Sequence, residues 1–481
     1  VSFHCVYITK KNMKIKNKVL WCSGSFVLFI LGVQHFFPKF RLIRFQQRKC
    51  AQYKPLHFDI TFSHRKECLK SVHQSQSAEV EVTNLNTIDE IITRGYNAST
   101  HTFVSKDGYY SSIYRISGGA NSPPRNGKRA ILMYHGFLAT GASWIIQPGS
   151  RNLAFTLVNA GYDVWLANSR GTTPSKKHRH YDADKDLDYW DFGSVELSQL
   201  DLPQMIDLIL RETGTDKLYY VCHSMGCAVL FTGLADVPEL NNKIEANFLL
   251  APPTHMGSSY NPTFLLFPPI SGTPLQDLLF RFMGGRINGE PNAFLKALGL
   301  TAVKVCGWSS MRCGICDNLI FAMFGADPEQ MDYDNFPTIV RMLTGTGALK
   351  PFFHGLQVNE ACAFQRNDYG TSRNLLEYGS LKPPRYNLTG ITVPTYIFYS
   401  ENDNFVTPWD AERVRNAIPK EFMRGFYKVG WHKFNHIDFL MAKEADILLY
   451  HKIRDIIMDL EQYNECYLQG NEFCAGKSQK Y

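Results

Sequence analysis

The sequence predicts an α/β fold in which helices cover both faces of a mostly parallel sheet. From about residue 81, short apolar runs alternate with segments of helical periodicity, and this alternation is typical of such sheets. Residues 253–380 break it with clusters of Pro and Gly and short apolar pieces such as 294–298. We interpret them as an insertion, a cap over the carboxyl edge of the sheet, where open α/β sheets bind their ligands.

The core elements can be assigned in chain order. A helix is expected to begin near Asp201, whose carboxylate can cap free backbone amides, with Pro203 in its first turn. A second helix is expected from Gly226 onward. Short apolar runs predict strands at 130–134, 161–167, 217–222 and 393–399.

Length and charge limit the class of protein. The chain has 481 residues, of which 44% are hydrophobic and 20% are charged, so it can form one large domain or two to three smaller ones. Its net charge is +7, but the basic residues are scattered apart from 10–18 and 39–49. A nucleic-acid partner is therefore not expected.

An apolar run near the N-terminus predicts a signal peptide or a membrane anchor. Residues 19–33 are apolar and follow Met13 and a short basic stretch, as in secretory signals. No small-residue cleavage site follows, and uncharged sequence continues to Pro38, so an uncleaved single-pass anchor is the alternative. A buried core helix is a third interpretation of this run.

Twelve cysteines fit either an oxidising compartment or a cytosolic protein with free thiols, and two glycosylation sequons favour the secretory route. The sequons predict N-glycosylation of Asn97 and Asn387. We expect a secreted protein or one in the lysosomal or endomembrane lumen, with a membrane-anchored form as the alternative. The expected parts are an N-terminal extension with signal or anchor (1–37), a leader (38–80), the first core part (81–252), the cap insertion (253–380), the second core part (381–462) and a tail (463–481).

The stretch YYVCHSMGCA places Ser224 between an expected strand and an expected helix. A serine on such a turn exposes its hydroxyl, and the next amide, that of Met225, lies at a helix N-terminus where it can stabilise an oxyanion. The usual motif is G-x-S-x-G, but here Cys222 replaces the first glycine. Cys222 falls at the end of the strand, where we expect that a compact side chain is sufficient and that a positive φ is not needed. The second glycine of the motif, at the more restrictive position, is present as Gly226.

The other groups of a serine-hydrolase site are expected at later or earlier strand ends. A second oxyanion amide is expected from Phe137, directly after strand 130–134. The acid should follow a later strand, and Asp403 lies just past the carboxyl end of strand 393–399. Glu401 and Asp410 are the alternatives for the acid.

The general base should come last in the chain. His432 and His436 both lie in the stretch GWHKFNHIDF, and spacing alone does not choose between them. The base would take the proton of Ser224 while the acid holds its other ring nitrogen and stabilises the imidazolium. The residues therefore predict nucleophilic catalysis by Ser224 that needs no metal and no organic cofactor.

A set of short motifs resembles the acid lipase family, which comprises gastric and lysosomal acid lipases and their invertebrate relatives. The resemblance extends over roughly residues 82–462. In chain order the motifs are YHGF (134–137), ASWI (142–145), GYDVWL (161–166), NSRG (168–171), YWDF (189–192), DLP (201–203), PRYNLT (384–389), ND (402–403) and NHIDF (435–439).

The resemblance implies an α/β-hydrolase fold with a helical cap and a lipid ester substrate met at a lipid–water interface. It also implies Ser224 as nucleophile, Asp403 as acid and His436 as base, because the family's His-Leu-Asp-Phe block aligns with 436–439. Phe137 and Met225 would supply the oxyanion amides.

Other implications of the resemblance concern the cap and the departures from the family. A family disulfide in the cap implies that Cys306 pairs with Cys316 or with Cys313. The family usually has Gly at the position of Cys222 and Leu at that of Phe137, and its segment after the acid is more apolar than 404–408.

Three functions are compatible with these residues. The expected one is hydrolysis of triacylglycerols or steryl esters, with the preference set by the cap. A non-catalytic lipid carrier on the same fold is the first alternative, although such a protein would be expected to lose a triad residue. A carboxylesterase or transacylase acting on smaller esters is the second.

Overall fold

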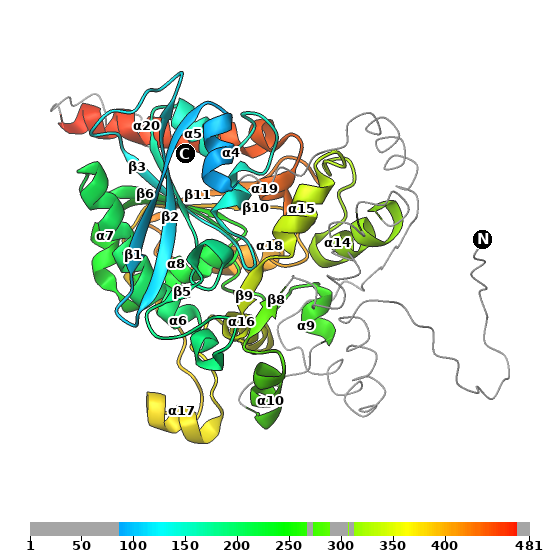
Figure 1. The fold of residues 1–481 in the computed structure, drawn as a ribbon. Helices are drawn as coiled ribbons and strands as arrows, with labels where there is room; N and C mark the ends of the chain where they lie inside the picture. Colours follow the sequence, from blue (N-terminus) through cyan, green and yellow to red (C-terminus); the bar gives the residue numbers. More distant parts are fainter. Residues whose placement is uncertain (1–85, 267–272, 289–305, 307–311, 469–481) are drawn as a thin grey trace, which may run out of the picture. The chain divides into compact units, whose positions relative to one another are not determined.

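A nine-stranded sheet forms the centre of the molecule (Figure 1). The computed structural model describes residues 86–266, 273–288, 306 and 312–468. The strand order is β1-β2-β4-β3-β6-β7-β10-β11, with β5 paired to β2. The six strands from β4 to β11 in that order are parallel neighbours, whereas β1 and β5 pair antiparallel to β2, and β2 pairs antiparallel to β4. The predicted α/β class is confirmed.

The bounds of the elements are as follows. The strands are β1 (Tyr96–Val104), β2 (Tyr109–Gly119), β3 (Ala130–Tyr134), β4 (Asp163–Ala167), β5 (Lys177–His178), β6 (Leu218–His223), β7 (Ile244–Leu250), β8 (Arg286–Asn288), β9 (Thr346–Ala348), β10 (Thr395–Tyr399) and β11 (Met423–Lys428). The helices are α4 (Thr87–Thr93), α5 (Leu153–Asn159), α6 (Ser194–Glu196), α7 (Leu202–Thr213), α8 (Met225–Asp236), α9 (Pro262–Leu266), α10 (Pro274–Phe282), α14 (Asp317–Phe324), α15 (Phe336–Leu343), α16 (Leu349–Ala361), α17 (Thr371–Tyr378), α18 (Pro408–Ala417), α19 (Asp438–Met441) and α20 (His451–Leu468).

The central strands are apolar on both sides because helices cover both faces of the sheet. Every residue of β3 is buried. Ile131 and Met133 belong to a core cluster with residues of α5 and α20. The alternate residues Leu132 and Tyr134 belong to a second cluster with residues of α7 and α8. Because alternate side chains of a strand point to opposite faces, β3 packs against a helical layer on each side of the sheet.

The start of α7 differs from the prediction in one respect. The helix begins at Leu202 with Pro203 in its first turn, as predicted. Asp201, however, makes no capping hydrogen bond, since it continues a preceding helical turn with φ −87° and ψ −50°. Its carboxylate instead accepts a hydrogen bond from Nε of Arg170 at 2.7 Å. The prediction of an Asp201 cap is wrong, because a buried cation competes for the carboxylate.

The segment 253–380, predicted to be a cap, lies in the chain between β7 and β10. It contains α9, α10, α14 to α17 and the two-stranded β8–β9 sheet. Cys306 and Cys316 form a disulfide in it, with Cα atoms 5.8 Å apart. The predicted helical piece at 294–298 and the apolar run at 19–33 lie outside the described residues. Within the described part, no helix is both long and apolar enough to span a membrane.

Candidate active site

Three side chains from separate parts of the chain form one hydrogen-bonded line. Ser224 lies between β6 and α8, Asp403 follows β10, and His436 lies between β11 and α19. Ser224 Oγ is 2.9 Å from His436 Nε2. His436 Nδ1 is 2.8 Å from Asp403 Oδ2. This arrangement orients a general base toward a hydroxyl and a carboxylate toward the base.

Asp403 is held rigidly behind the histidine. Its Oδ1 accepts hydrogen bonds from the amides of Phe405 at 2.7 Å and Val406 at 2.8 Å. Its side chain is fully buried. Oδ2 is therefore the oxygen that faces His436, and the carboxylate has a fixed orientation.

The backbone and ring of His436 are also fixed. Its amide donates to the carbonyl of Phe324 at 3.3 Å, and its carbonyl accepts from Nε2 of His223 at 2.9 Å. Burial lowers the pKa of His223 to about 3, so that ring is neutral and donates through Nε2. The rings of Phe324 and Phe405 flank His436 with centroids 6.1 and 5.0 Å away.

Ser224 has the backbone conformation of a sharp strand-to-helix turn. Its φ of 51° and ψ of −123° place a non-glycine residue in a strained region. Its amide donates to the carbonyl of Leu250 at 3.0 Å, which fixes the turn to β7. A Cβ on Gly226 would lie 2.6 Å from the carbonyl oxygen of Tyr134. Gly226 is thus required because α8 passes so close to the end of β3.

The strand end and the helix start are joined by a disulfide between Cys222 and Cys227, with Cα atoms 5.2 Å apart. Both residues are fully buried. Cys222 does not have a positive φ, which agrees with the expectation that the position needs no glycine freedom. The bridge itself was not predicted. The only signal for it was the presence of two cysteines on either side of the serine.

The candidate oxyanion amides are those of Phe137 and Met225. Met225 is the first residue of α8, and Phe137 lies in the loop after β3. Within the described residues, neither amide donates to a protein acceptor. Both are therefore available to an incoming anionic oxygen.

His135 holds the loop that carries Phe137. Its Nδ1 is 2.7 Å from the carbonyl of Gly136, and its Nε2 accepts from the amide of Ser169 at 3.1 Å. Burial lowers the pKa of His135 to about 4, so the ring stays neutral with its proton on Nδ1. The NSRG turn thereby fixes the loop that carries Phe137.

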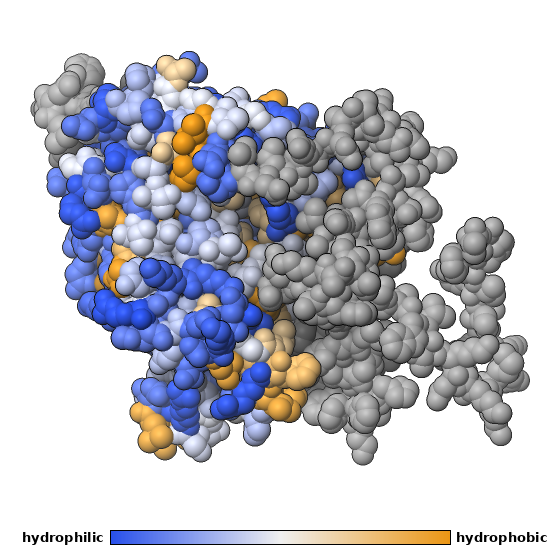
Figure 2. All heavy atoms as spheres, viewed as in Figure 1, coloured by the Kyte–Doolittle hydropathy of each residue, from blue (hydrophilic) through white to orange (hydrophobic). Residues whose placement is uncertain are grey.

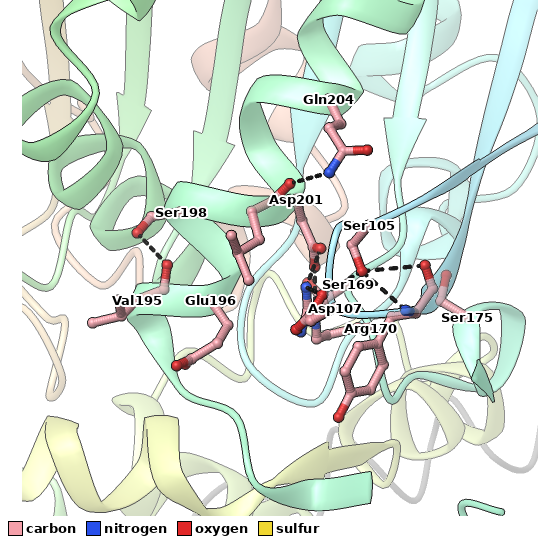
Figure 3. Close-up of polar contacts among 12 residues, drawn as sticks. Ser105, Asp107, Ser169, Arg170, Ser175, Val195, Glu196, Ser198, Asp201 and Gln204 are labelled. Carbon is pink, nitrogen blue, oxygen red and sulfur yellow. Dashed lines mark hydrogen bonds and ion pairs between the residues drawn. The ribbon is translucent and has the colours of Figure 1, made fainter. Parts of the chain in front are cut away.

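Arg170 in turn holds the NSRG turn in position. Figure 3 shows its guanidinium between Asp107 and Asp201, which approach from the β1–β2 turn and from the start of α7. The Arg170 side chain is fully buried. A buried guanidinium needs such partners, since an unpaired charge in this position would be costly.

The alternative acids and base lie elsewhere. His432 is exposed. Glu401 is paired at the surface with Lys428 at 2.9 Å. Asp410 is buried in α18 and accepts from Thr407 Oγ1 at 2.9 Å. None of these three takes part in the hydrogen-bonded line to Ser224.

Two other predicted features concern modification and metals. Asn97 lies on β1 and Asn387 follows the cap segment, and both are exposed. No group of three or more His, Cys, Asp or Glu side chains in the described residues is arranged to hold a metal ion.

Comparisons with known proteins show which family the chain resembles. A family model described as the alpha/beta hydrolase fold matches residues 129–431, and one described as a partial alpha/beta-hydrolase lipase region matches 87–148. The chain is 32% identical to lipase member K of Homo sapiens, covering 79% of this chain and 92% of that protein. It is 31% identical to lipase 3 of Drosophila melanogaster (75% and 89%) and to gastric triacylglycerol lipase of Rattus norvegicus (77% and 91%).

Proposed function

This chain belongs to the α/β-hydrolase lipases and is a lipid ester hydrolase, and we propose that Ser224, Asp403 and His436 carry out its reaction. The observation that carries the proposal is the continuous line of hydrogen bonds, 2.9 Å from Ser224 Oγ to His436 and 2.8 Å from His436 to Asp403. The family resemblance seen in the sequence is confirmed by the matches to lipases over most of the chain.

The reaction follows from the geometry. Ser224 Oγ attacks the ester carbonyl while His436 Nε2 takes its proton, and Asp403 stabilises the imidazolium. The amides of Phe137 and Met225 bind the oxyanion of the tetrahedral intermediate. The intermediate collapses as His436 returns the proton to the departing alcohol, which leaves an acyl group on Ser224.

Hydrolysis of the acyl-enzyme reverses these roles. A water molecule gives its proton to His436 and attacks the acyl carbonyl. The second tetrahedral intermediate releases the fatty acid and returns the proton to Ser224. The bonds that form and break in these steps belong to the ester, the water, Ser224 and His436.

The proposed substrates are triacylglycerols or steryl esters presented at a lipid–water interface. The name gastric triacylglycerol lipase of a relative supports the first. Figure 2 shows apolar surface near α10 and α17. The most exposed large apolar side chains there are Phe282 and Leu278 on α10 and Leu376 on α17. Exposed apolar side chains of this kind favour contact with lipid.

The proposed location is the secretory pathway or beyond it. Two disulfides, Cys222–Cys227 and Cys306–Cys316, are typical of an oxidising compartment. Exposed Asn97 and Asn387 are accessible for glycosylation. Mass spectrometry before and after glycosidase treatment of the secreted protein tests both sites.

The two histidines of one loop provide a matched test of the mechanism. Ser224→Ala and His436→Ala should each lower kcat on a long-chain glyceride by about 10⁴-fold. His432→Ala, in an exposed position, should stay within about twofold of the wild type. Hydrolysis retained by Ser224→Ala would refute the assignment. Analysis of products with a competing alcohol separates hydrolysis from transacylation.

A further inference from the structure

Two carboxyl groups that the triad does not use are buried against one another. Asp327 lies three residues after α14, in the predicted cap segment, and Asp438 begins α19 two residues after His436. Asp327 is 0% exposed and Asp438 is 1% exposed. Their side chains lie close enough together to share a hydrogen bond. Two carboxyl groups can share such a bond only if one of them keeps a proton.

The surrounding donors indicate which carboxyl group holds the proton. Asp327 Oδ2 accepts from Nε1 of Trp431 at 2.7 Å, and its Oδ1 accepts from the amide of Gln330 at 3.3 Å. Asp327 is therefore placed as the ionised acceptor. Asp438 Oδ2 accepts from the amide of Asn435 at 2.7 Å. Burial and the neighbouring Asp327 raise the pKa of Asp438 well above its ordinary value.

The bond joins the predicted cap segment to the loop of the catalytic histidine. Close to it, Asn435 Nδ2 donates to the carbonyl of Gly325 at 3.0 Å. The amide of His436 donates to the carbonyl of Phe324 at 3.3 Å. The backbone position of His436 therefore depends on how closely the segment after α14 lies against this loop.

Acidic groups face the pair from both sides. The titratable groups around it include Glu329, itself paired with Lys433, on the side of Asp327, and Asp403 and Tyr450 on the side of Asp438. Ionisation of Asp438 would thus place its charge near two other acids. Such a charge in a buried position is costly unless the structure opens.

We propose that Asp438 and Asp327 are positioning residues: Asp438 donates its proton to the Asp327 carboxylate, and this bond keeps His436 aligned with Ser224. The proposal rests on the proposed function, because it concerns the same histidine. When Asp438 loses its proton, the two carboxylates repel, the segment after α14 separates from the loop and hydrolysis falls. The pair therefore sets the pH above which the hydrolytic activity declines.

The direction of the pH effect follows from the linkage of protonation to folding. Since the pKa of Asp438 is raised in the folded state, the folded chain keeps this proton where the unfolded chain has lost it. The contribution of the pair to stability is full at acid pH and is lost as pH rises through the raised pKa. Activity should decline over the same interval.

Asp438→Asn is the decisive variant, because an amide reproduces both bonds of the protonated acid. Its Nδ2 can donate to Asp327 and its Oδ1 can accept from the amide of Asn435, with no proton to lose. We expect the wild type to lose kcat/KM by up to about tenfold per pH unit on the alkaline side. The variant should not show that decline. An unchanged alkaline decline in Asp438→Asn would overturn the proposal.

Asp327→Asn tests the other half of the pair. An amide has only one acceptor oxygen, so it cannot serve Trp431, Gln330 and Asp438 as the carboxylate does. We expect its kcat to be lower than that of the wild type at every pH, with normal expression and fold checked by circular dichroism. Full activity at acid pH in this variant would contradict the assigned direction of the bond.

Two control variants test whether another acidic residue causes the alkaline decline in activity. Burial raises the pKa of Asp410 to about 7, so this residue is a rival titrating group. Asp410→Asn should keep the alkaline decline, and its loss in that variant would assign the effect to Asp410. Glu329→Gln removes a nearby charge but no bond of the pair, and it should keep the decline as well.

Labelling by a fluorophosphonate separates this proposal from the proposed function. If the wild type is not labelled on Ser224, the catalytic assignment fails, and the positioning role fails with it. If Ser224 is labelled and the pH profile of Asp438→Asn matches that of the wild type, only the positioning role fails. Labelling rates measured across pH should follow kcat/KM in each variant.

Discussion

Gly226→Ala should impair the enzyme although no triad atom is altered. A Cβ at this position would lie 2.6 Å from the carbonyl oxygen of Tyr134 and 2.9 Å from that of His135. Both are backbone atoms, so no rotamer change can relieve the contact. They lie at the end of β3 and the start of the loop that presents the amide of Phe137.

The size of the effect can be worked from this contact. A carbon–oxygen contact needs about 3.3 Å, so α8 and the end of β3 must separate by about 0.7 Å. Overpacking of this kind costs about 1–3 kcal/mol of folding free energy. The same movement shifts the amide of Met225 relative to that of Phe137. Since a misplacement of about 1 Å can cost about 100-fold in rate, we expect kcat to fall by about 10- to 100-fold.

Steady-state hydrolysis of a soluble ester and a thermal melt measure both effects. Gly390→Ala is the matched control, because no atom lies within 4 Å of a Cβ there and the residue does not have a positive φ. The control should keep the activity and melting temperature of the wild type. A Gly226→Ala protein with kcat within about twofold of the wild type would refute the argument that close packing of α8 on β3 sets the site.

Three further predictions concern stability. Replacing Cys222 and Cys227 together by Ala removes a loop closure of about five residues and should lower the free energy of unfolding by about 2 kcal/mol in a urea titration; an unchanged midpoint would show that the bridge contributes nothing. Arg170→Leu leaves the carboxylate of Asp201 buried without its cation and should cost about 3–5 kcal/mol, read as a large fall in melting temperature; an unaltered melt would contradict this. Asp438→Asn should make the melting temperature less dependent on pH, because it removes a group whose raised pKa withdraws stability as pH rises; a dependence equal to that of the wild type would contradict the shared proton.

Local patterns predicted the core of the fold well. The strand expected at 130–134 is β3 with the same bounds, and the one expected at 217–222 is β6, Leu218–His223. Both are short apolar runs that end in polar turns. Residues close together in the chain are therefore enough to identify them as strands. The residues alone could not choose between His432 and His436, because that choice depends on the path of a whole loop.

Features that depend on distant partners could not be predicted in this way. Asp201 was expected to cap a helix, but a guanidinium from another loop takes its carboxylate. The contact of Asp327 with Asp438 joins residues more than a hundred positions apart. No periodicity or propensity in the sequence carries such information, since it arises only when the chain is folded.

Above all, we propose that Ser224 is a nucleophile activated by His436. The most direct measurement is the intact mass of the protein after reaction with a fluorophosphonate, followed by peptide mapping. We predict one adduct per chain, located on Ser224, with none on Ser224→Ala and much slower labelling of His436→Ala. An adduct on another residue, or no adduct on a protein that still hydrolyses lipid esters, would contradict the assignment of Ser224 as nucleophile.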